Sequence, residues 1–393
     1  MRYDTVPLGT ICNRVVSGGT PKSTISDYYD GGIPWLNTKE VHFNRIYQTE
    51  RTISELGLNN SAAKWIAPHS VIVAMYGATA GNTAVNQVSL TTNQACCNLE
   101  INEVKADYRY IYYYLKLQYR KLSALANGGA QQNLNAQLIK RFEVLLPKMD
   151  VQKEIADILW TLDDKIELNN KINDNLEQQA QAYFQELFVD NSDSAWTLGT
   201  VSDLGAVVGG STPSKSKPEY YTEDGIAWIT PKDLSINKAK FISHGENDIT
   251  ELGLKNSSAS IMPEGTVLFS SRAPIGYIAI ASGEVTTNQG FKSVVPKPEI
   301  GIAYVYYFLK HNLPVIEGMA SGSTFKEVSG STMKNVPAVI PDTETLACFN
   351  NFCAPIFAQQ RILEEQNQSL ATLRDSLLPK LMSGEIDVSD IQL

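Results

Sequence analysis

The sequence predicts an α+β protein that is a tandem duplication, in which a globular mixed α/β block is followed by a long helix in each copy. Three observations support this prediction. Six short motifs occur twice in the same order, each copy begins with short β-type runs separated by Gly, Pro, Asn and Thr, and each copy ends with apolar residues at helical spacing. With 393 residues, 43% hydrophobic and 19% charged, the chain has the composition of two or three packed domains.

The duplication is visible as six pairs of similar segments. The pairs are 8–10 (LGT) with 198–200 (LGT), 18–21 (GGTP) with 209–213 (GGSTP), 32–35 (GIPW) with 225–228 (GIAW), 55–58 (ELGL) with 251–254 (ELGL), 91–94 (TTNQ) with 286–289 (TTNQ), and 110–116 (YIYYYLK) with 304–310 (YVYYFLK). The shift stays between 190 and 196 residues throughout, so chance does not explain the pattern.

The globular blocks are predicted to span residues 1–147 and 192–341. Each contains β-type runs, such as 71–75 and 267–270, and a Tyr-rich helical stretch whose aromatic side chains are expected in the core.

A long helix is predicted within residues 148–191 and another within 342–393. The first has apolar residues at alternating spacings of four and three, with polar layers at Asn169 and Asn173, and the second has leucines spaced by seven. Pro355 suits a first helical turn and Gly384 a helix end. The predicted coiled-coil seam consists of Ile155, Leu159, Leu162, Ile166, Leu176, Tyr183, Leu187, Ile356, Leu363, Leu370 and Leu377. The alternative is that each helix packs only on its own block.

The net charge of −9 belongs to the helices, which together carry −11, whereas the two blocks together carry +2. The acidity therefore does not exclude DNA as a partner of the blocks. The five cysteines form no CxxC pair, which argues against a zinc site or a disulfide framework. Neither a signal peptide nor a membrane span is expected, and the protein is predicted to be cytoplasmic.

Catalytic motifs are missing from the sequence. It contains no GxxxxGK[ST], HExxH or GxSxG pattern, and its four histidines are scattered. We therefore predict no catalytic residue, no metal site and no enzyme activity of the chain alone.

Polar loop residues recur between the copies instead. Hydroxyls and a lysine beside a Gly-rich turn can bind phosphate oxygens, and side-chain amides can bind base edges, although capping of turns is the alternative at each position. Aligning Gly81 with Gly276 places Gly77 opposite Arg272, and arginine commonly reads guanine. The candidate DNA contacts are Thr20, Lys22, Asn37, Lys39, Tyr76, Thr79, Asn93, Gln94, Gln131, Gln132, Thr212, Lys215, Thr230, Lys232, Ser271, Arg272, Asn288, Gln289 and Lys326.

These motifs, together with the ending 377–386 (LLPKLMSGEI), resemble the specificity subunit of type I restriction-modification systems over essentially the whole chain. The second copy departs from the first at Ala227, where the first has Pro34, and at 323–326 (STFK), where the first has 130–133 (AQQN). Both departures fall in blocks that are expected to vary with the target sequence.

The resemblance implies two target-recognition domains that each read one half of a bipartite, asymmetric site in double-stranded DNA. It implies that the two helices pair antiparallel as a coiled-coil spacer. The implied partners are two modification subunits, which bind S-adenosylmethionine and methylate adenine, and restriction subunits, which use ATP and Mg²⁺. The chain itself would hold no cofactor. Two alternatives remain: a coiled-coil adaptor without a DNA role, and a nuclease or methyltransferase with an unrecognised active site.

Overall fold

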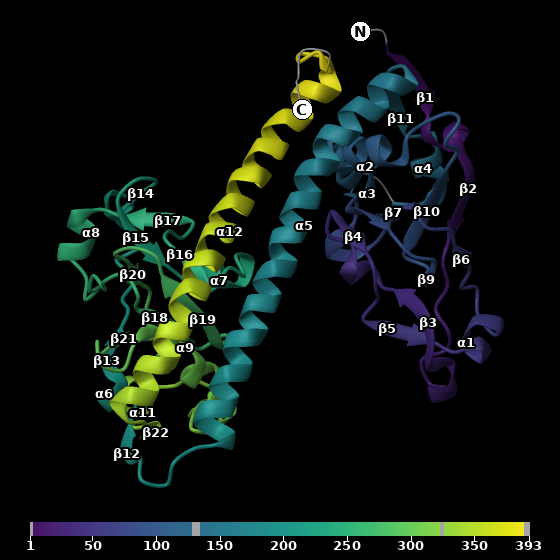
Figure 1. Cartoon of the computed structure of the whole chain (residues 1–393). Helices are drawn as coiled ribbons and strands as arrows, with labels where there is room; N and C mark the ends of the chain where they lie inside the picture. Colours follow the sequence, from purple (N-terminus) through teal and green to yellow (C-terminus); the bar gives the residue numbers. More distant parts are fainter. Residues whose placement is uncertain (1–2, 128–133, 323–325, 389–393) are drawn as a thin grey trace. The chain divides into compact units, whose positions relative to one another are not determined.

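The computed structural model describes residues 3–127, 134–322 and 326–388 (Figure 1). The chain divides into two compact units. The first unit comprises residues 1–165 and 369–393, and the second comprises residues 166–368. Each unit therefore holds one globular domain and a part of each long helix.

The first unit contains three small sheets that are mostly antiparallel. Their strand orders are β2 (Cys12–Ser17), β10 (Cys96–Ile101), β7 (Val71–Ala74), β8 (Thr83–Asn86) and β4 (Asn44–Ile46); then β5 (Arg51–Ile53), β3 (Tyr29–Leu36), β9 (Leu90–Thr92) and β6 (Trp65–Ile66); and β1 (Asp4–Pro7) with β11 (Glu143–Leu146). The pairs β4–β8 and β3–β9 are parallel. The domain's α-helices are α1 (Glu55–Asn59), α2 (Tyr108–Leu117), α3 (Tyr119–Asn127) and α4 (Ala136–Arg141).

The second unit repeats this topology except at the edges of its four-stranded sheet. Its strand orders are β13 (Gly205–Gly209), β21 (Lys292–Pro296), β18 (Val267–Ser271), β19 (Ile275–Ala281) and β16 (Phe241–Ile242); then β14 (Tyr221–Thr222), β17 (Asn247–Ile249), β15 (Ile226–Ile229) and β20 (Thr286–Thr287); and β12 (Thr197–Thr200) with β22 (Pro337–Ile340). Its short α-helices are α6 (Val201–Leu204), α7 (Pro231–Ile236), α8 (Glu251–Lys255), α9 (Ile302–His311), α10 (Leu313–Gly318) and α11 (Gly330–Lys334). The predicted duplication and α+β class are confirmed.

The Tyr-rich helices α2 and α9 are buried in the domain cores, as predicted. Tyr110 and Tyr304 occupy equivalent positions, and each hydroxyl donates to a backbone carbonyl, of Leu145 at 2.7 Å and of Val339 at 2.6 Å. Because a buried hydroxyl without a partner would cost about 1–3 kcal/mol, these bonds let tyrosine serve as a core residue.

The two long helices are α5 (Met149–Gln185), followed by a π-helical turn (Glu186–Asp190), and α12 (Thr343–Ser383). The prediction that the second helix opens at Pro355 is wrong. Asp342 caps the helix earlier, where its carboxylate accepts from the Thr345 amide at 2.9 Å and the Thr345 hydroxyl at 2.7 Å. Gly384, with φ of 76°, follows the last helical residue, as predicted.

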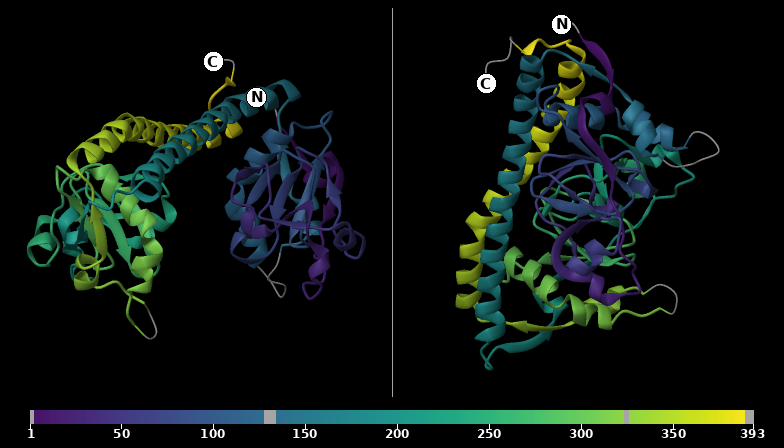
Figure 2. Two further views of the ribbon diagram at one scale, coloured as in Figure 1. Left: turned by 60° about the horizontal axis from the view of Figure 1, so that its bottom comes forward. Right: turned by 90° about the vertical axis from the view of Figure 1, so that its right-hand side faces the viewer.

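Within the second unit the two helices run antiparallel, as Figure 2 shows. Asn169 Nδ2 donates to Asn367 Oδ1 at 2.9 Å, and Gln360 Nε2 donates to the backbone oxygen of Asn173 at 3.2 Å. The residue numbers of the partners on α12 decrease as those on α5 increase, which shows that the two helices are antiparallel. The predicted polar layers at Asn169 and Asn173 are therefore confirmed, and polar residues of α12 face them.

The predicted seam is correct only in part, because the helices also enter the domain cores. Ile155 and Leu159 are fully buried in the first unit's core, and Ile356 lies in that of the second. Leu162, Ile166 and Leu370 are only half-buried. The pattern missed further buried residues, among them Phe184, Leu378, Leu381 and Met382, because each helix carries one stripe for the partner helix and another for a domain. No helix of the described residues is long and apolar enough to cross a membrane.

A buried polar network, the Lys240 network, joins the second domain to both helices. Lys240 directly precedes β16, and its ammonium contacts Glu177 of α5, Gln360 of α12 at 2.6 Å and the Tyr307 hydroxyl at 3.2 Å. Glu177 also accepts from Lys310 at 2.6 Å and from Tyr307 at 2.9 Å. Burial alone would raise the pKa of Glu177, but the two ammonium groups outweigh it and lower this pKa to about 2.

The first unit is joined in a similar way by Arg45 of β4. Its guanidinium lies 3.6 Å from the ring centroid of Trp160, donates to the Trp160 carbonyl at 3.0 Å and pairs with Asp164. Asp163 accepts from Arg374 of α12 at 2.6 Å. A buried cation thus ties each domain to α5.

Candidate nucleic-acid interface

In both units the Gly-rich turn lies against the TTNQ segment. The Gly19 amide donates to the Thr92 carbonyl at 2.9 Å, and the Ser211 amide donates to the Thr287 carbonyl at 2.8 Å. The preceding glycine of each turn has no room for a side chain, because a Cβ on Gly18 would lie 2.0 Å from a backbone oxygen. Gly210 is confined in the same way, 2.0 Å from the Asn288 oxygen.

These hydrogen bonds correct the sequence alignment of the turn. Gly19 is equivalent to Ser211, and Thr20 to Thr212, so the turn itself contains no inserted residue.

A tryptophan and a tyrosine hold each turn by donating hydrogen bonds to its backbone carbonyls. Trp35 Nε1 donates to the Gly19 carbonyl at 2.9 Å, and Trp228 Nε1 donates to the Ser211 carbonyl at 3.0 Å. The prolines that follow accept from the hydroxyls of Tyr29 at 2.7 Å and Tyr221 at 2.6 Å. The sequence marked the Gly-Ile-x-Trp segment as a repeated motif, but the role of its tryptophan in holding the turn was missed.

The Thr–Gln pair on top of each turn is exposed. The Thr20 hydroxyl donates to Gln94 Oε1, and the Thr212 hydroxyl donates to Gln289 Oε1. This bond fixes the amide and leaves its Nε2 hydrogens to donate outward. We name the turn, its tryptophan and this Thr–Gln pair the anchor of each domain.

Lysines surround each anchor. Lys22 and Lys215 are exposed on the turns. Lys39 pairs with Glu50, and Lys232 with Glu246, and each hydrogen bond raises the pKa of its lysine. Water screens the charges of exposed pairs of this kind, so a phosphate can displace the carboxylate at little cost.

In the second unit the anchor opens onto a cavity of about 580 Å³. Six of the predicted contacts line it: Thr212, Lys215, Thr230, Lys232, Asn288 and Gln289. The structure thus brings together residues that are up to 77 positions apart in the sequence.

Several candidates also have the turn-capping role that was the alternative. Asn37 caps the 3-10 turn Thr38–Glu40, and Thr230 forms a capping box with Asp233 at the start of α7. The side-chain oxygens of Asn93 and Asn288 accept from the amides two residues ahead, of Ala95 at 3.1 Å and Gly290 at 2.8 Å.

The loop after β7 and β18 differs between the domains. Met75 N donates to Ala95 O in the first unit, and Ser271 N donates to Gly290 O in the second. Exposed Tyr76, and not Gly77, is therefore the counterpart of Arg272, which corrects the sequence alignment.

The remaining candidates fall into three groups. Ser271 is fully buried and donates to Gly290 O at 3.1 Å, so it is not a contact in this conformation. The Thr79 hydroxyl donates to the Thr38 carbonyl at 3.1 Å, whereas Lys326 is exposed. Gln131 and Gln132 lie outside the described residues.

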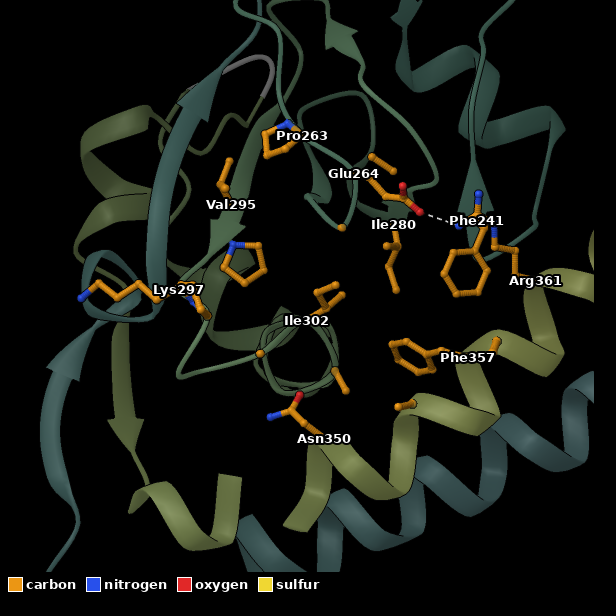
Figure 3. Close-up of a pocket in the computed structure, with 18 of the residues that line it drawn as sticks. Phe241, Pro263, Glu264, Ile280, Val295, Lys297, Ile302, Asn350, Phe357 and Arg361 are labelled. Carbon is orange, nitrogen blue, oxygen red and sulfur yellow. Dashed lines mark hydrogen bonds and ion pairs between the residues drawn. The ribbon is translucent and has the colours of Figure 1, made fainter. Parts of the chain in front are cut away.

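A larger cavity of about 650 Å³ lies between the second domain and α12 (Figure 3). Phe241, Ile280, Ile302 and Phe357 line it, and Arg361 pairs with Glu264 at its edge at 2.5 Å. None of the candidate contacts lines this apolar cavity. Across the described residues, no group of three or more His, Cys, Asp or Glu side chains is placed to hold a metal ion.

Comparison with known proteins decides the family. The model of the type I restriction modification DNA specificity domain matches residues 2–178 and 193–374. This chain belongs to that family. The predicted resemblance is therefore correct, and the chain falls among the specificity subunits, which are the non-catalytic recognition subunits of these enzymes.

Relatives agree with this assignment. Over 191 residues the chain is 40% identical to the type I restriction enzyme MjaIX specificity subunit of Methanocaldococcus jannaschii, a match that spans 46% of this chain and 44% of that protein. It is 25% identical over 344 residues to the HindI specificity subunit of Haemophilus influenzae, covering 68% of this chain and 74% of that protein. The S subunit of a type I restriction-modification system from M. genitalium shares the fold, with a TM-score of 0.62, 17% identity and coverage of 97% and 96%.

Proposed function

We propose that this chain is the DNA-recognition subunit of a type I restriction-modification complex. Its target-recognition domains, residues 1–147 and 192–341, each read one half of a bipartite, asymmetric DNA site. Adenine methylation and DNA cleavage are then directed to that site but are carried out by partner subunits.

The observation that carries the proposal is the anchor, which is built in the same way in both domains. Both pairs, Thr20–Gln94 and Thr212–Gln289, stand on a turn held by a tryptophan and flanked by lysines. Two identical anchors cannot distinguish two unlike half-sites. They suit what the half-sites share, the phosphodiester backbone, whereas Tyr76 and Arg272 at the differing loop suit base edges.

The partners follow from the family and the charge. With a net charge of only +2 in the two domains together, backbone affinity must come from local lysines and from other subunits. We propose two modification subunits that bind S-adenosylmethionine and restriction subunits that use ATP and Mg²⁺, all in the cytoplasm.

The long helices are the proposed spacer, over residues 148–191 and 342–393. The 37 residues of α5 correspond to about 55 Å at 1.5 Å per residue. This length is of the order needed to hold two domains on half-sites about one turn of DNA apart.

Selection from a random DNA library with the complex of this chain and its modification subunit tests the proposal. We expect enrichment of two unlike short motifs at a fixed gap. Q94A and Q289A should each weaken binding without changing either motif, because they alter backbone contacts. Absence of any enriched sequence from an assembled complex would contradict the proposal and favour the adaptor.

A further inference from the structure

Beside the second anchor, three charged side chains from separate segments meet. Arg272 follows β18, and Lys292 begins β21. Glu327 directly precedes Val328, whose amide donates to the Ser271 carbonyl at 3.0 Å. Arg272 Nη1 lies 3.4 Å from Glu327 Oε2, and Lys292 Nζ lies 3.8 Å from Glu327 Oε1. We name these three residues the Glu327 cluster.

The cluster is continuous with the anchor and open to solvent on one side. Lys292 Nζ donates to the Gln289 carbonyl at 3.3 Å, next to the Thr212–Gln289 pair. The side chains of Arg272 and Glu327 are each 38% exposed, whereas that of Lys292 is 15% exposed. A ligand that rests on the anchor can therefore reach Arg272 and Glu327, with Lys292 behind them.

Glu327 makes this cluster a poor site for phosphate. Its carboxylate contacts two cations at once, so a phosphate oxygen would have to displace it from both, whereas Glu50 and Glu246 each pair with a single lysine. Lys292 cannot turn outward as an exposed lysine does, because its stem is buried, and this burial lowers its pKa while Glu327 opposes the effect. The lysines around the anchors, by contrast, stand on exposed turns.

The same arrangement matches the major-groove edge of a G·C pair. Guanine presents the acceptors N7 and O6, which an arginine can contact with two donors, and cytosine presents an N4 amino donor, which a carboxylate accepts. A donor and an acceptor that lie 3.4 Å apart on two neighbouring segments present both halves of this pattern.

Resting on the proposed function, we infer that Glu327 is a specificity-determining residue of the second domain. It holds Arg272 away from the phosphates, orients it on a guanine and accepts from a cytosine N4 of the same or the neighbouring pair. The first domain has Tyr76 in place of Arg272 and fully buried Cys97 in place of Lys292, so it reads its half-site by other contacts.

The test measures binding of the complex of this chain and its modification subunit to its selected target and to every single-base variant of the second half-site. E327Q keeps the shape of the side chain and removes its charge, E327A removes both, and R272A removes the donor. The matched control is E251Q, because Glu251 forms an exposed pair with Lys255 on α8, away from the cluster.

We expect R272A to lose about tenfold to a hundredfold of discrimination at one G·C position. E327Q and E327A should lose at least about tenfold at the same or the adjacent position, and their non-specific binding should become stronger and more salt-dependent as Arg272 turns to a phosphate. The first half-site and the E251Q variant should be unchanged.

Two results would overturn the inference: unchanged discrimination in both Glu327 variants, or a uniform loss of affinity for all sequences, which would indicate a structural role. Circular dichroism and assembly with the modification subunit verify that the variants fold. If the wild-type complex itself shows no sequence preference, the proposed function fails, and this result is distinct from failure of the Glu327 variants alone.

Discussion

Replacement of Lys240 by methionine should loosen the attachment of the second domain to both helices. Only 6% of the Lys240 side chain is exposed, which makes it the most deeply buried of the three charged groups Lys240, Glu177 and Lys310. In K240M the carboxylate of Glu177 and the amide oxygen of Gln360 lose a donor inside the protein. The methionine still fills the space beside Phe357, whose ring centroid lies 4.3 Å from the Lys240 ammonium, so the loss is electrostatic rather than a cavity.

The expected loss is about 3 kcal/mol in the free energy of local unfolding. Removal of one partner of a buried ion pair costs about 3–5 kcal/mol. The lower end applies because Glu177 keeps Lys310 at 2.6 Å and Tyr307 at 2.9 Å. K310M is the matched control, and it should cost about 1 kcal/mol or less, because 39% of its side chain is exposed. The double variant K240M/E177M should recover most of the loss, since it leaves no unpaired carboxylate behind.

Hydrogen exchange followed by mass spectrometry measures this effect on peptides that cover residues 173–180, 236–242 and 357–364. The faster exchange in K240M should be confined to these peptides and their neighbours in the second unit. If K240M stays within about 1 kcal/mol of the wild type, or if the double variant is as unstable as the single one, the charge pairing is not what holds the domain to the helices.

Three further predictions follow from the same structure. The free energy of unfolding of the second unit should fall by up to about 3 kcal/mol as the pH drops from 4.5 to about 2, because the lowered pKa of Glu177 stabilises the fold only while its carboxylate is ionised. Thermal melts at a series of pH values should show this loss, and E177Q should lack most of it. G210A should destabilise the second anchor and weaken DNA binding, because the new Cβ would lie 2.0 Å from a backbone oxygen. The control G283A should bind normally, because its Cβ would meet nothing within 4 Å. Equal binding by the two variants would contradict the role of the anchor in DNA binding. Insertion of four residues, about one turn, into α5 after Asn169 and into α12 before Gln366 should lengthen the gap between half-sites read in a DNA selection, and an unchanged gap would refute the spacer.

Sequence reasoning was sufficient for the fold because the information is repeated and local. The recurrence of GGTP, GIPW and TTNQ defined the two copies, and the apolar spacing defined the helices. The prediction placed the start of α12 too late, at Pro355, because a proline that suits a first helical turn was preferred to the cap at Asp342. The predicted coiled-coil seam was incomplete for a different reason. Phe184 and Leu381 face a domain core, and one sequence does not show how many neighbours a helix has.

The candidate site was predicted in outline and not in detail. The paired motifs pointed to Thr20, Gln94 and their counterparts, but nothing local to Trp35 showed that its indole holds the turn. Glu327 was missed because it lies 55 residues from Arg272, and a charge pair at that separation leaves no pattern in a single sequence. The alignment of Gly77 with Arg272 was wrong because the loop is one residue shorter in the second copy, and only the hydrogen bonds of Met75 and Ser271 reveal where the register changes.

The most direct test of the central claim is methylation-sensitive single-molecule sequencing of DNA from cells that express this chain with its modification subunit. We predict N6-methyladenine in two unlike short motifs separated by a fixed gap, and the motif read by the second domain alone should change in R272A. DNA without a methylated motif, from an assembled complex supplied with methyl donor, would contradict the assignment of this chain as a recognition subunit.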